Sequence, residues 1–363
     1  MRWYQRTLGL AAALCVSFSS MAQADQLGLT EGGVELHSAN VLAFGPYGVL
    51  FVGDAKAARV YAIQTGDLKG DPAKVTINIE GAASKIAAAL GASTVEIADM
   101  AVNPLTGSVF VSTMADGKVQ LVQIGPDGKI ARLALDKVAH AKLDIPNPPE
   151  DKVVGEGRRA RNNRPNSVTD LAFVDGRLLL SGISQGDTPS TVRAFDFPFN
   201  DKAAATGLEI YHGAHGQLEN YAPIRTFVPF IINGEANVLA GFVCTPLVKF
   251  PVASIGAGEQ VRGTTVAELG NRNQPLDMIA YKKEGKDYLL LANSARGVMK
   301  ISTEDLDKAA GIESKVAETA GQKYETVAEW QGVVQLDLLN EGHAIVLVKN
   351  EGGQGDLRTW VLP

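Results

Sequence analysis

Short apolar strands separated by turns recur along most of the chain. In each copy, one strand leads through a turn to a second apolar strand, and a third strand follows after a short break. Six copies follow this pattern, at residues 41–63, 99–124, 170–195, 225–250, 277–301 and 337–362. The first turn of each copy contains Gly, alone or with Asn, Asp or Glu, and such turns are typical of β-hairpins.

A fourth strand-like segment lies between successive copies. These segments occupy residues 75–80, 131–135, 208–212, 264–269 and 326–330. Four short antiparallel strands that repeat every ~40–60 residues are typical of β-propeller blades. The pattern therefore predicts an all-β fold, a six-bladed β-propeller of four-stranded antiparallel blades.

The last blade needs a strand from elsewhere in the chain. The sixth copy reaches the C-terminus without a fourth strand, and residues 27–36 have a suitable composition to supply it. We expect this N-terminal strand to close the ring, because closure removes two open sheet edges. Two segments interrupt the strand pattern: residues 82–93 predict a short helix, and residues 303–320 predict a short helix or a loop.

The first residues have the features of a secretory signal peptide. Arg2 and Arg6 precede a short apolar core at residues 8–18, and Ala22 and Ala24 form a small-residue cleavage site. We therefore expect residues 1–24 to be removed and residues 25–363 to form a single propeller domain.

Cysteine content and charge indicate the compartment and exclude some partners. Cleavage would leave Cys244 as the only cysteine, and an exported chain without a disulfide framework indicates the Gram-negative periplasm. Loss of two signal-peptide cations would change the formal net charge from −6 to −8. An acidic chain argues against nucleic-acid binding. No later stretch is long and apolar enough to span a membrane, and a monomer is expected.

The chain resembles six-bladed propellers of the NHL, YVTN and gluconolactonase-like group. The resemblance is clearest in LAFGPYGVLFVGD (42–54) and AVNPLTGSVFVS (101–112), and the blade rhythm extends it over most of the chain. It implies that most binding occurs on one face, here called the upper face, which carries the turns between second and third strands and the connections between blades. It does not imply one activity, because such folds include lactonases, other hydrolases, lyases and binding scaffolds.

Several acids align on the innermost strands, which line the channel of a propeller. The aligned positions are Val41, Asp99, Asp170, Arg225, Asp277 and Asp337, with Asn166 and Asn273 just before this level. Carboxylate and amide oxygens suit Ca²⁺ or Mg²⁺, so Asp99, Asp170, Asp277, Asn166 and Asn273 are candidate ligands of a divalent cation. Alternatively, the aspartates bond to backbone groups at turns, or raise one another's pKa and act as general acids or bases.

The longest connection between repeats, residues 136–166, is expected on the upper face. It carries a basic cluster of Arg158, Arg159, Arg161 and Arg164. Guanidinium groups bind carboxylates and phosphates in a bidentate manner. The cluster therefore predicts an anionic ligand or an acidic partner protein, and a solvated loop is the alternative.

A second group of candidate residues is expected on the same face. It consists of His215, Glu219, Asn220, Arg225 and Cys244, with His212 nearby. Imidazole with thiolate suits a transition metal or a nucleophile pair. The alternative is that His212 ends a strand at the surface and that Cys244 is a small buried apolar residue.

These observations favour a periplasmic binding or accessory protein over an enzyme. The sequence lacks a P-loop, a nucleophile elbow, a covalent haem motif and a clustered Cys/His zinc motif. The predicted ligand is a small anion or a partner protein at the upper face and channel mouth. The alternative is a hydrolase or lactonase that depends on a divalent cation, with Ca²⁺ in an Asp-lined channel. A third class is a redox accessory protein that uses Cys244 and the histidines.

Overall fold

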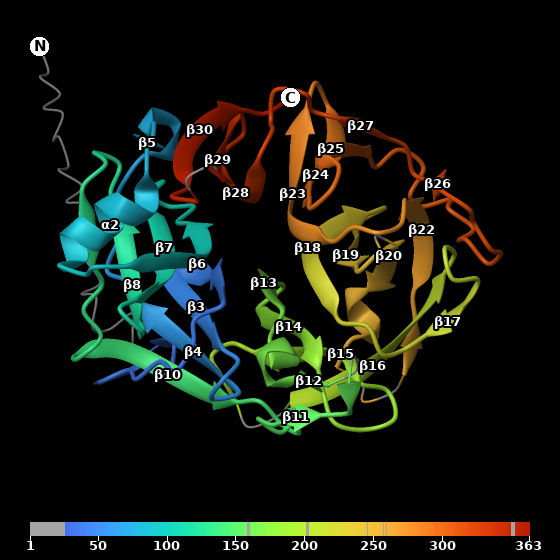
Figure 1. The fold of residues 1–363 in the computed structure, drawn as a ribbon, viewed down its shortest axis with the longest axis horizontal. Coiled ribbons are helices and arrows are strands. Elements are labelled where there is room, and N and C mark those ends of the chain that lie inside the picture. Colours follow the sequence, from blue (N-terminus) through green and yellow to red (C-terminus); the bar gives the residue numbers. More distant parts are fainter. Residues whose placement is uncertain are drawn as a thin grey trace, which may run out of the picture.

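Six antiparallel sheets form a ring around a central channel in the computed structural model of this protein (Figure 1). The structure describes residues 26–157, 160–200, 203–244, 246–256, 258, 260–349 and 353–363. The prediction of an all-β, six-bladed propeller is confirmed. The predicted signal peptide lies outside the described residues.

The first three blades, numbered in chain order, have their inner strands in the first half of the sequence. Blade 1 contains β2 (Val41–Phe44), β3 (Val49–Asp54), β4 (Arg59–Gln64), β10 (Val138–Asp144) and β1 (Thr30–Gly32). Blade 2 contains β6 (Val95–Val102), β7 (Val109–Ala115), β8 (Lys118–Ile124) and β9 (Ile130–Arg132). Blade 3 contains β13 (Asp170–Val174), β14 (Arg177–Ile183), β15 (Ser190–Asp196), β16 (Ala203–His212), β17 (Gln217–Glu219) and the parallel strand β21 (Val261–Arg262).

The other three blades complete the ring. Blade 4 contains β18 (Ile224–Ile232), β19 (Glu235–Phe242), β20 (Pro246–Pro251), β22 (Thr264–Leu269) and β26 (Thr319–Gly321). Blade 5 contains β23 (Pro275–Lys283), β24 (Lys286–Asn293), β25 (Gly297–Ser302) and β27 (Tyr324–Thr326). Blade 6 contains β28 (Val333–Asn340), β29 (His343–Val348), β30 (Asp356–Val361) and β5 (Asn78–Ile79).

Each blade is buried on both faces, which explains why many strands are apolar without a polar alternation. Strand β3, for example, is buried along its whole length. Six apolar clusters fill the six seams between neighbouring blades. The cluster between blades 1 and 3 contains Phe51 and Val168, and the one between blades 2 and 6 contains Val111 and Ile345. The ring is therefore held by burial at each seam.

The blades do not follow one another around the ring in chain order. Inner strand β2 contacts β6 on one side and β13 on the other, and β6 in turn contacts β28. Blade 1 therefore lies between blades 2 and 3, and blade 2 closes the ring against blade 6 (Figure 1). The expectation that residues 136–166 lie on the upper face is wrong for residues 138–144. Part of that segment returns along the outer edge of blade 1, where β10 pairs with β4.

The remainder of that segment is short and partly regular. Strands β11 (Val153–Val154) and β12 (Arg161–Asn162) form a two-stranded hairpin. A 3₁₀ turn at Arg164–Ser167 then leads into the inner strand of blade 3. The hairpin is the part of the connection that projects beyond the sheets (Figure 1).

A strand from the N-terminal part of the chain completes blade 6, as predicted, but residues 27–36 do not supply it. Strand β5 pairs with β30 (Figure 1). Residues 30–32 instead form β1, which pairs with β10 at the outer edge of blade 1. The apolar side chains of Val75, Ile77 and Ile79 decide this arrangement, because all three are buried in the seam between blades 6 and 2.

The two breaks in the strand pattern have different structures. The helix predicted at residues 82–93 is α2 (Ala82–Leu90), which ends at Gly91 in the left-handed conformation. Residues 303–318 form turns and loop, and β26 follows at the outer edge of blade 4. Of the helices in the described part of the chain, none has the length and apolar character needed to cross a membrane.

Candidate functional site

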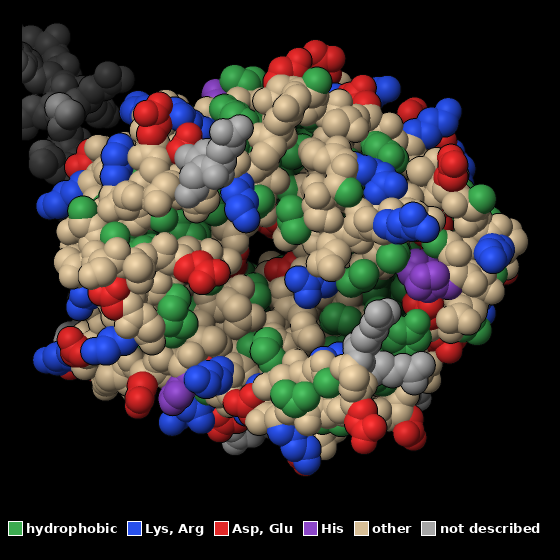
Figure 2. Space-filling model, in the orientation of Figure 1, with side chains coloured by type: hydrophobic (Ala, Val, Ile, Leu, Met, Phe, Trp, Pro, Cys, Tyr) green, Lys and Arg blue, Asp and Glu red, His purple; other side chains and the backbone are tan. Residues whose placement is uncertain are grey.

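The central channel is lined by the inner strands of all six blades. It has a volume of about 560 Å³. Three of the predicted cation ligands, Asp99, Asp170 and Asp277, line it together with Asp337 and Arg225. Figure 2 shows an opening of the ring near the centre of the face in view.

Each channel aspartate bonds to the backbone of the neighbouring blade. The Oδ2 atoms of Asp99, Asp170, Asp277 and Asp337 accept N–H donors of the next inner strand at 2.6–2.8 Å, from Leu42, Phe227, Leu336 and Val102 respectively. Asp170 and Asp277 also accept the N–H of the following residue through Oδ1 at 2.8 Å. The aspartates thus link blades across four of the six seams. They bond to backbone groups, as in the alternative, but those groups lie in the inner strand of the neighbouring blade and not at a turn.

Burial makes these carboxyl groups weak acids. It raises the pKa of Asp170 to about 7 and that of Asp337 to about 6, against partial compensation by the backbone N–H donors. The pKa values of Asp99 and Asp277 lie well above the ordinary range, because burial is reinforced by the other channel aspartates. At neutral pH the channel is therefore less negative than its residue types imply.

The five predicted cation ligands do not come together in the channel. Asn166 and Asn273 are absent from its lining. Asn273 is buried, and its amide bonds to the carbonyl oxygens of Gly270 and Asn271 and to the side chain of Asn293. A cation site in the channel would have to rely on aspartates whose oxygens already accept N–H donors, and it stays a prediction.

Arg225 is the only cationic side chain that the described residues contribute to the channel lining. A bulge near the start of β18, between Ile224 and Thr226, positions it. It forms no ion pair and donates no side-chain hydrogen bond to another described residue, and its Nε is buried without a partner. Its charge lowers the pKa of Asp170, which burial raises. The guanidinium group is therefore available to an anion.

The basic cluster does not form a single anion site among the described residues. Arg158 and Arg159 lie outside them. Arg161 is exposed on the hairpin strand β12. Arg164 has a structural role, because its guanidinium group donates hydrogen bonds to the backbone carbonyl oxygens of Lys56 and Pro149 at 3.0 and 2.9 Å.

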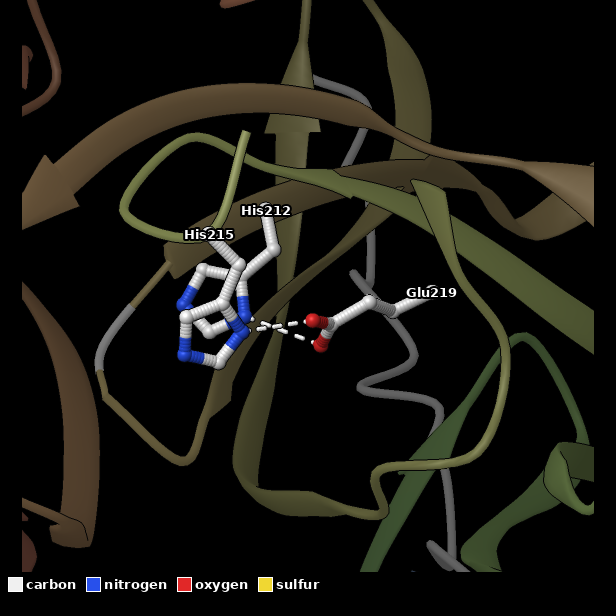
Figure 3. A group of neighbouring side chains, drawn as sticks. All are labelled: His212, His215 and Glu219. Carbon is white, nitrogen blue, oxygen red and sulfur yellow. Dashed lines mark hydrogen bonds and ion pairs between the residues drawn. The ribbon is translucent and has the colours of Figure 1, made fainter. Parts of the chain in front are cut away.

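The structure brings His212, His215 and Glu219 together at the turn between β16 and β17 (Figure 3). One oxygen atom from Glu219 lies 2.9 Å from Nδ1 of His212, and the other lies 2.5 Å from Nδ1 of His215. The two imidazole rings are in contact, with centroids 3.9 Å apart and an interplanar angle of 40°. His212 and Glu219 are buried, whereas the His215 side chain is 45% exposed. The alternative that His212 ends a strand at the surface is therefore wrong.

The electrostatics of this cluster keep Glu219 ionised. Burial raises its pKa, but hydrogen bonds from His212, His215 and Gln217 outweigh burial and lower the value to about 2. Glu268, which no sequence motif indicated, belongs to the same neighbourhood. It is fully buried on β22, and its Oε1 accepts the N–H of Gly213 at 2.5 Å. The sequence feature that could have indicated Glu268 is that it is the only charged residue in the strand TTVAEL.

Two other predicted residues, Cys244 and Asn220, lie near this cluster, together with Tyr221, which was not predicted. Burial raises the pKa of Tyr221, and a hydrogen bond to Glu219 and the nearby Cys244 raise it further. Cys244 is half-buried in the turn after β19, where its N–H donates to the carbonyl of Asn273. Asn220 is turned to a neighbouring loop, since its amide donates to the carbonyl of Asp187 at 3.2 Å.

Comparison with known proteins gives limited similarity. No family model matches the chain, and no curated protein matches it. Among solved structures, Drosophila Plexin A in complex with Semaphorin 1b is 9% identical, with 92% of this chain and 87% of that chain covered and a TM-score of 0.39. The Plexin A4 full extracellular region is 8% identical, with 92% and 40% covered and a TM-score of 0.43. Drosophila Semaphorin 2a is 7% identical, with 92% and 75% covered and a TM-score of 0.36.

Proposed function

We propose that this protein is an exported, periplasmic binding propeller that holds a small anionic ligand at the mouth of its central channel. Arg225 is the anchor of this ligand. The observation that carries the proposal is the free guanidinium group of Arg225, which lines the channel without an ion pair to any described residue. The Nε–H of Arg225 is buried without a partner, which is costly, and a carboxylate or phosphate ligand could accept hydrogen bonds from the guanidinium group in a bidentate manner.

The four channel aspartates repel an anionic ligand less strongly than their number suggests. If all four were ionised, they would repel it. Burial raises the pKa of each of them, and the pKa values of Asp99 and Asp277 lie well above the ordinary range. The positive charge of Arg225 then contributes more to the potential at the mouth. The membership of the NHL, YVTN and gluconolactonase-like group stays a prediction.

The proposal is tested by thermal shift and calorimetry with citrate, succinate and inorganic phosphate on three proteins. These are the parent, Arg225→Gln and Arg161→Gln. The last variant removes one exposed cation from the hairpin and is the matched control for charge. We expect at least one anion to stabilise the parent and Arg161→Gln alike, and to bind Arg225→Gln at least ~10-fold more weakly, because a charged hydrogen bond contributes about 1.5–3 kcal/mol.

Two outcomes contradict the proposal. One is that none of these anions binds the parent. The other is that binding depends on Arg161 and not on Arg225, which would move the anion site to the basic cluster.

A further inference from the structure

The turn between β16 and β17 brings two histidines into contact without a helix. The carbonyl oxygen of His212 accepts the N–H groups of His215 and Gly216 at 3.1 and 2.8 Å. Gly213 gives the turn the room it needs, because a Cβ there would lie 3.0 Å from the side chain of Glu268. In this turn, two histidines that are three positions apart in the sequence have their imidazole rings side by side.

Glu219 determines which nitrogen of each ring is free. An ionised carboxylate only accepts hydrogen bonds, and each of its two oxygens meets the Nδ1 atom of one histidine. Both Nδ1 atoms therefore carry the hydrogen. In the neutral rings, the lone pair then resides on Nε2.

Both Nε2 atoms lie on the same side of the two rings, away from Glu219 (Figure 3). The Nε2 atom of His212 is buried and has no hydrogen-bond partner among the described residues. Glu268 has a second buried oxygen, Oε2, that likewise lacks a partner there. Buried polar atoms without partners are rare, and here two of them belong to groups that interact electrostatically with each other.

We propose that His212 and His215 form a site for a divalent transition-metal ion, bound through their Nε2 atoms and oriented by Glu219. A carboxylate that accepts Nδ1–H while Nε2 binds metal is the usual support of a histidine ligand. Zn²⁺ or Cu²⁺ suits imidazole nitrogen, whereas Ca²⁺ requires oxygen ligands. The exposed edge of His215 provides the entry path.

This site is independent of the anion proposed at Arg225, and it has its own test. Zn²⁺ is titrated by calorimetry into the parent, His215→Gln and His37→Gln. His215 and His37 are both about half exposed, so neither substitution removes a core residue, and His37→Gln is the matched control. We expect one Zn²⁺ per chain in the parent and in the control, and at least ~10-fold weaker binding in His215→Gln.

Glu219→Gln tests the positioning role. A Gln side chain has one acceptor oxygen, so it can hold only one of the two Nδ1–H groups. We expect Zn²⁺ affinity to fall by about 10–100-fold. With Cu²⁺, electron paramagnetic resonance should show hyperfine coupling to two imidazole nitrogens in the parent and to one in His215→Gln. The proposal is overturned if the parent binds neither ion stoichiometrically, or if His215→Gln matches the parent in affinity and hyperfine pattern.

Discussion

Asp170 shows how one side chain can connect two blades and also respond to pH. Its two oxygens accept N–H groups from its own strand and from Phe227 of the next blade. Burial opposes its ionisation and raises its pKa to about 7. The position therefore serves the structure through hydrogen bonds while it remains poorly suited to carry a full negative charge.

The first prediction concerns the pH dependence of stability. The pKa of Asp170 is raised from 3.8 to about 7 and that of Asp337 to about 6, so the folded protein binds more protons than the unfolded chain between these values. The free energy of unfolding should fall as pH rises from about 4 to 7, by up to roughly 1.4 kcal/mol per pH unit for each group.

The free energy of unfolding can be measured by urea unfolding at several pH values. The proteins compared are the parent, Asp170→Asn and Asp127→Asn. An asparagine side chain does not titrate, so the slope should be smaller in Asp170→Asn. Asp127, in an exposed turn between β8 and β9, is the control, and Asp127→Asn should keep the slope of the parent. A stability that rises with pH over this range in the parent would contradict the prediction.

At the scale of single elements, β5 has a role out of proportion to its length. It is two residues long, yet it completes blade 6 and lies between the first and second blades in the sequence. The N–H of Ile77, just before it, donates to Oγ1 of Thr359, and its carbonyl accepts the N–H of Thr359 at 2.8 Å. The side chain of Ile77 is 1% exposed. This segment therefore joins residues from the N-terminal part of the chain to the C-terminal blade.

The second prediction follows from that burial. Ile77→Ala should lower the free energy of unfolding by about 2–5 kcal/mol, because it leaves a cavity in the seam between blades 6 and 2. Ile231→Ala is the matched control, since Ile231 is 59% exposed and should cost less than about 0.5 kcal/mol. Guanidinium unfolding followed by fluorescence measures both. Equal losses in the two variants would show that the β5 segment does not hold the ring closed.

At the scale of the whole molecule, the order of blades departs from the order of the chain. Blade 1 receives two of its strands, β1 and β10, from outside its own repeat. The ion pair between Lys137 and Glu31 joins these two segments, with Nζ and Oε1 3.2 Å apart. At the outer edge of blade 1, the N-terminal strand β1 is thus bound to β10, which belongs to the connection that leads to blade 3.

The third prediction uses this ion pair to test the topology. A zero-length carbodiimide cross-linker should join Lys137 to Glu31, because both side chains are exposed and in contact. Peptide mass spectrometry would identify the product, and Glu31→Gln should abolish it. If Glu31 were instead cross-linked to the C-terminal blade, closure by residues 27–36 would be right and the pairing of β1 with β10 wrong.

The sequence by itself determined the units of the fold. Alternating apolar strands and turns with Gly, Asn or Asp act over a few residues, so hairpins such as β6–β7 and β24–β25 follow from local chemistry. The same is true of α2, which was predicted from its apolar positions and ends at a glycine. The grouping of His215 with Glu219 was also accessible, since they are only four positions apart in the sequence.

Only the tertiary structure decided which distant segments meet. The alternation of Val75, Ile77 and Ile79 predicts a strand but not its partner, because backbone hydrogen bonds are the same for every partner and the apolar face fits any open seam. The same holds for Glu268, which approaches the His212 turn from another blade. Which segments pair depends on how completely their side chains are buried once all six blades are in place. This burial is a property of the closed ring, so no local segment determines it.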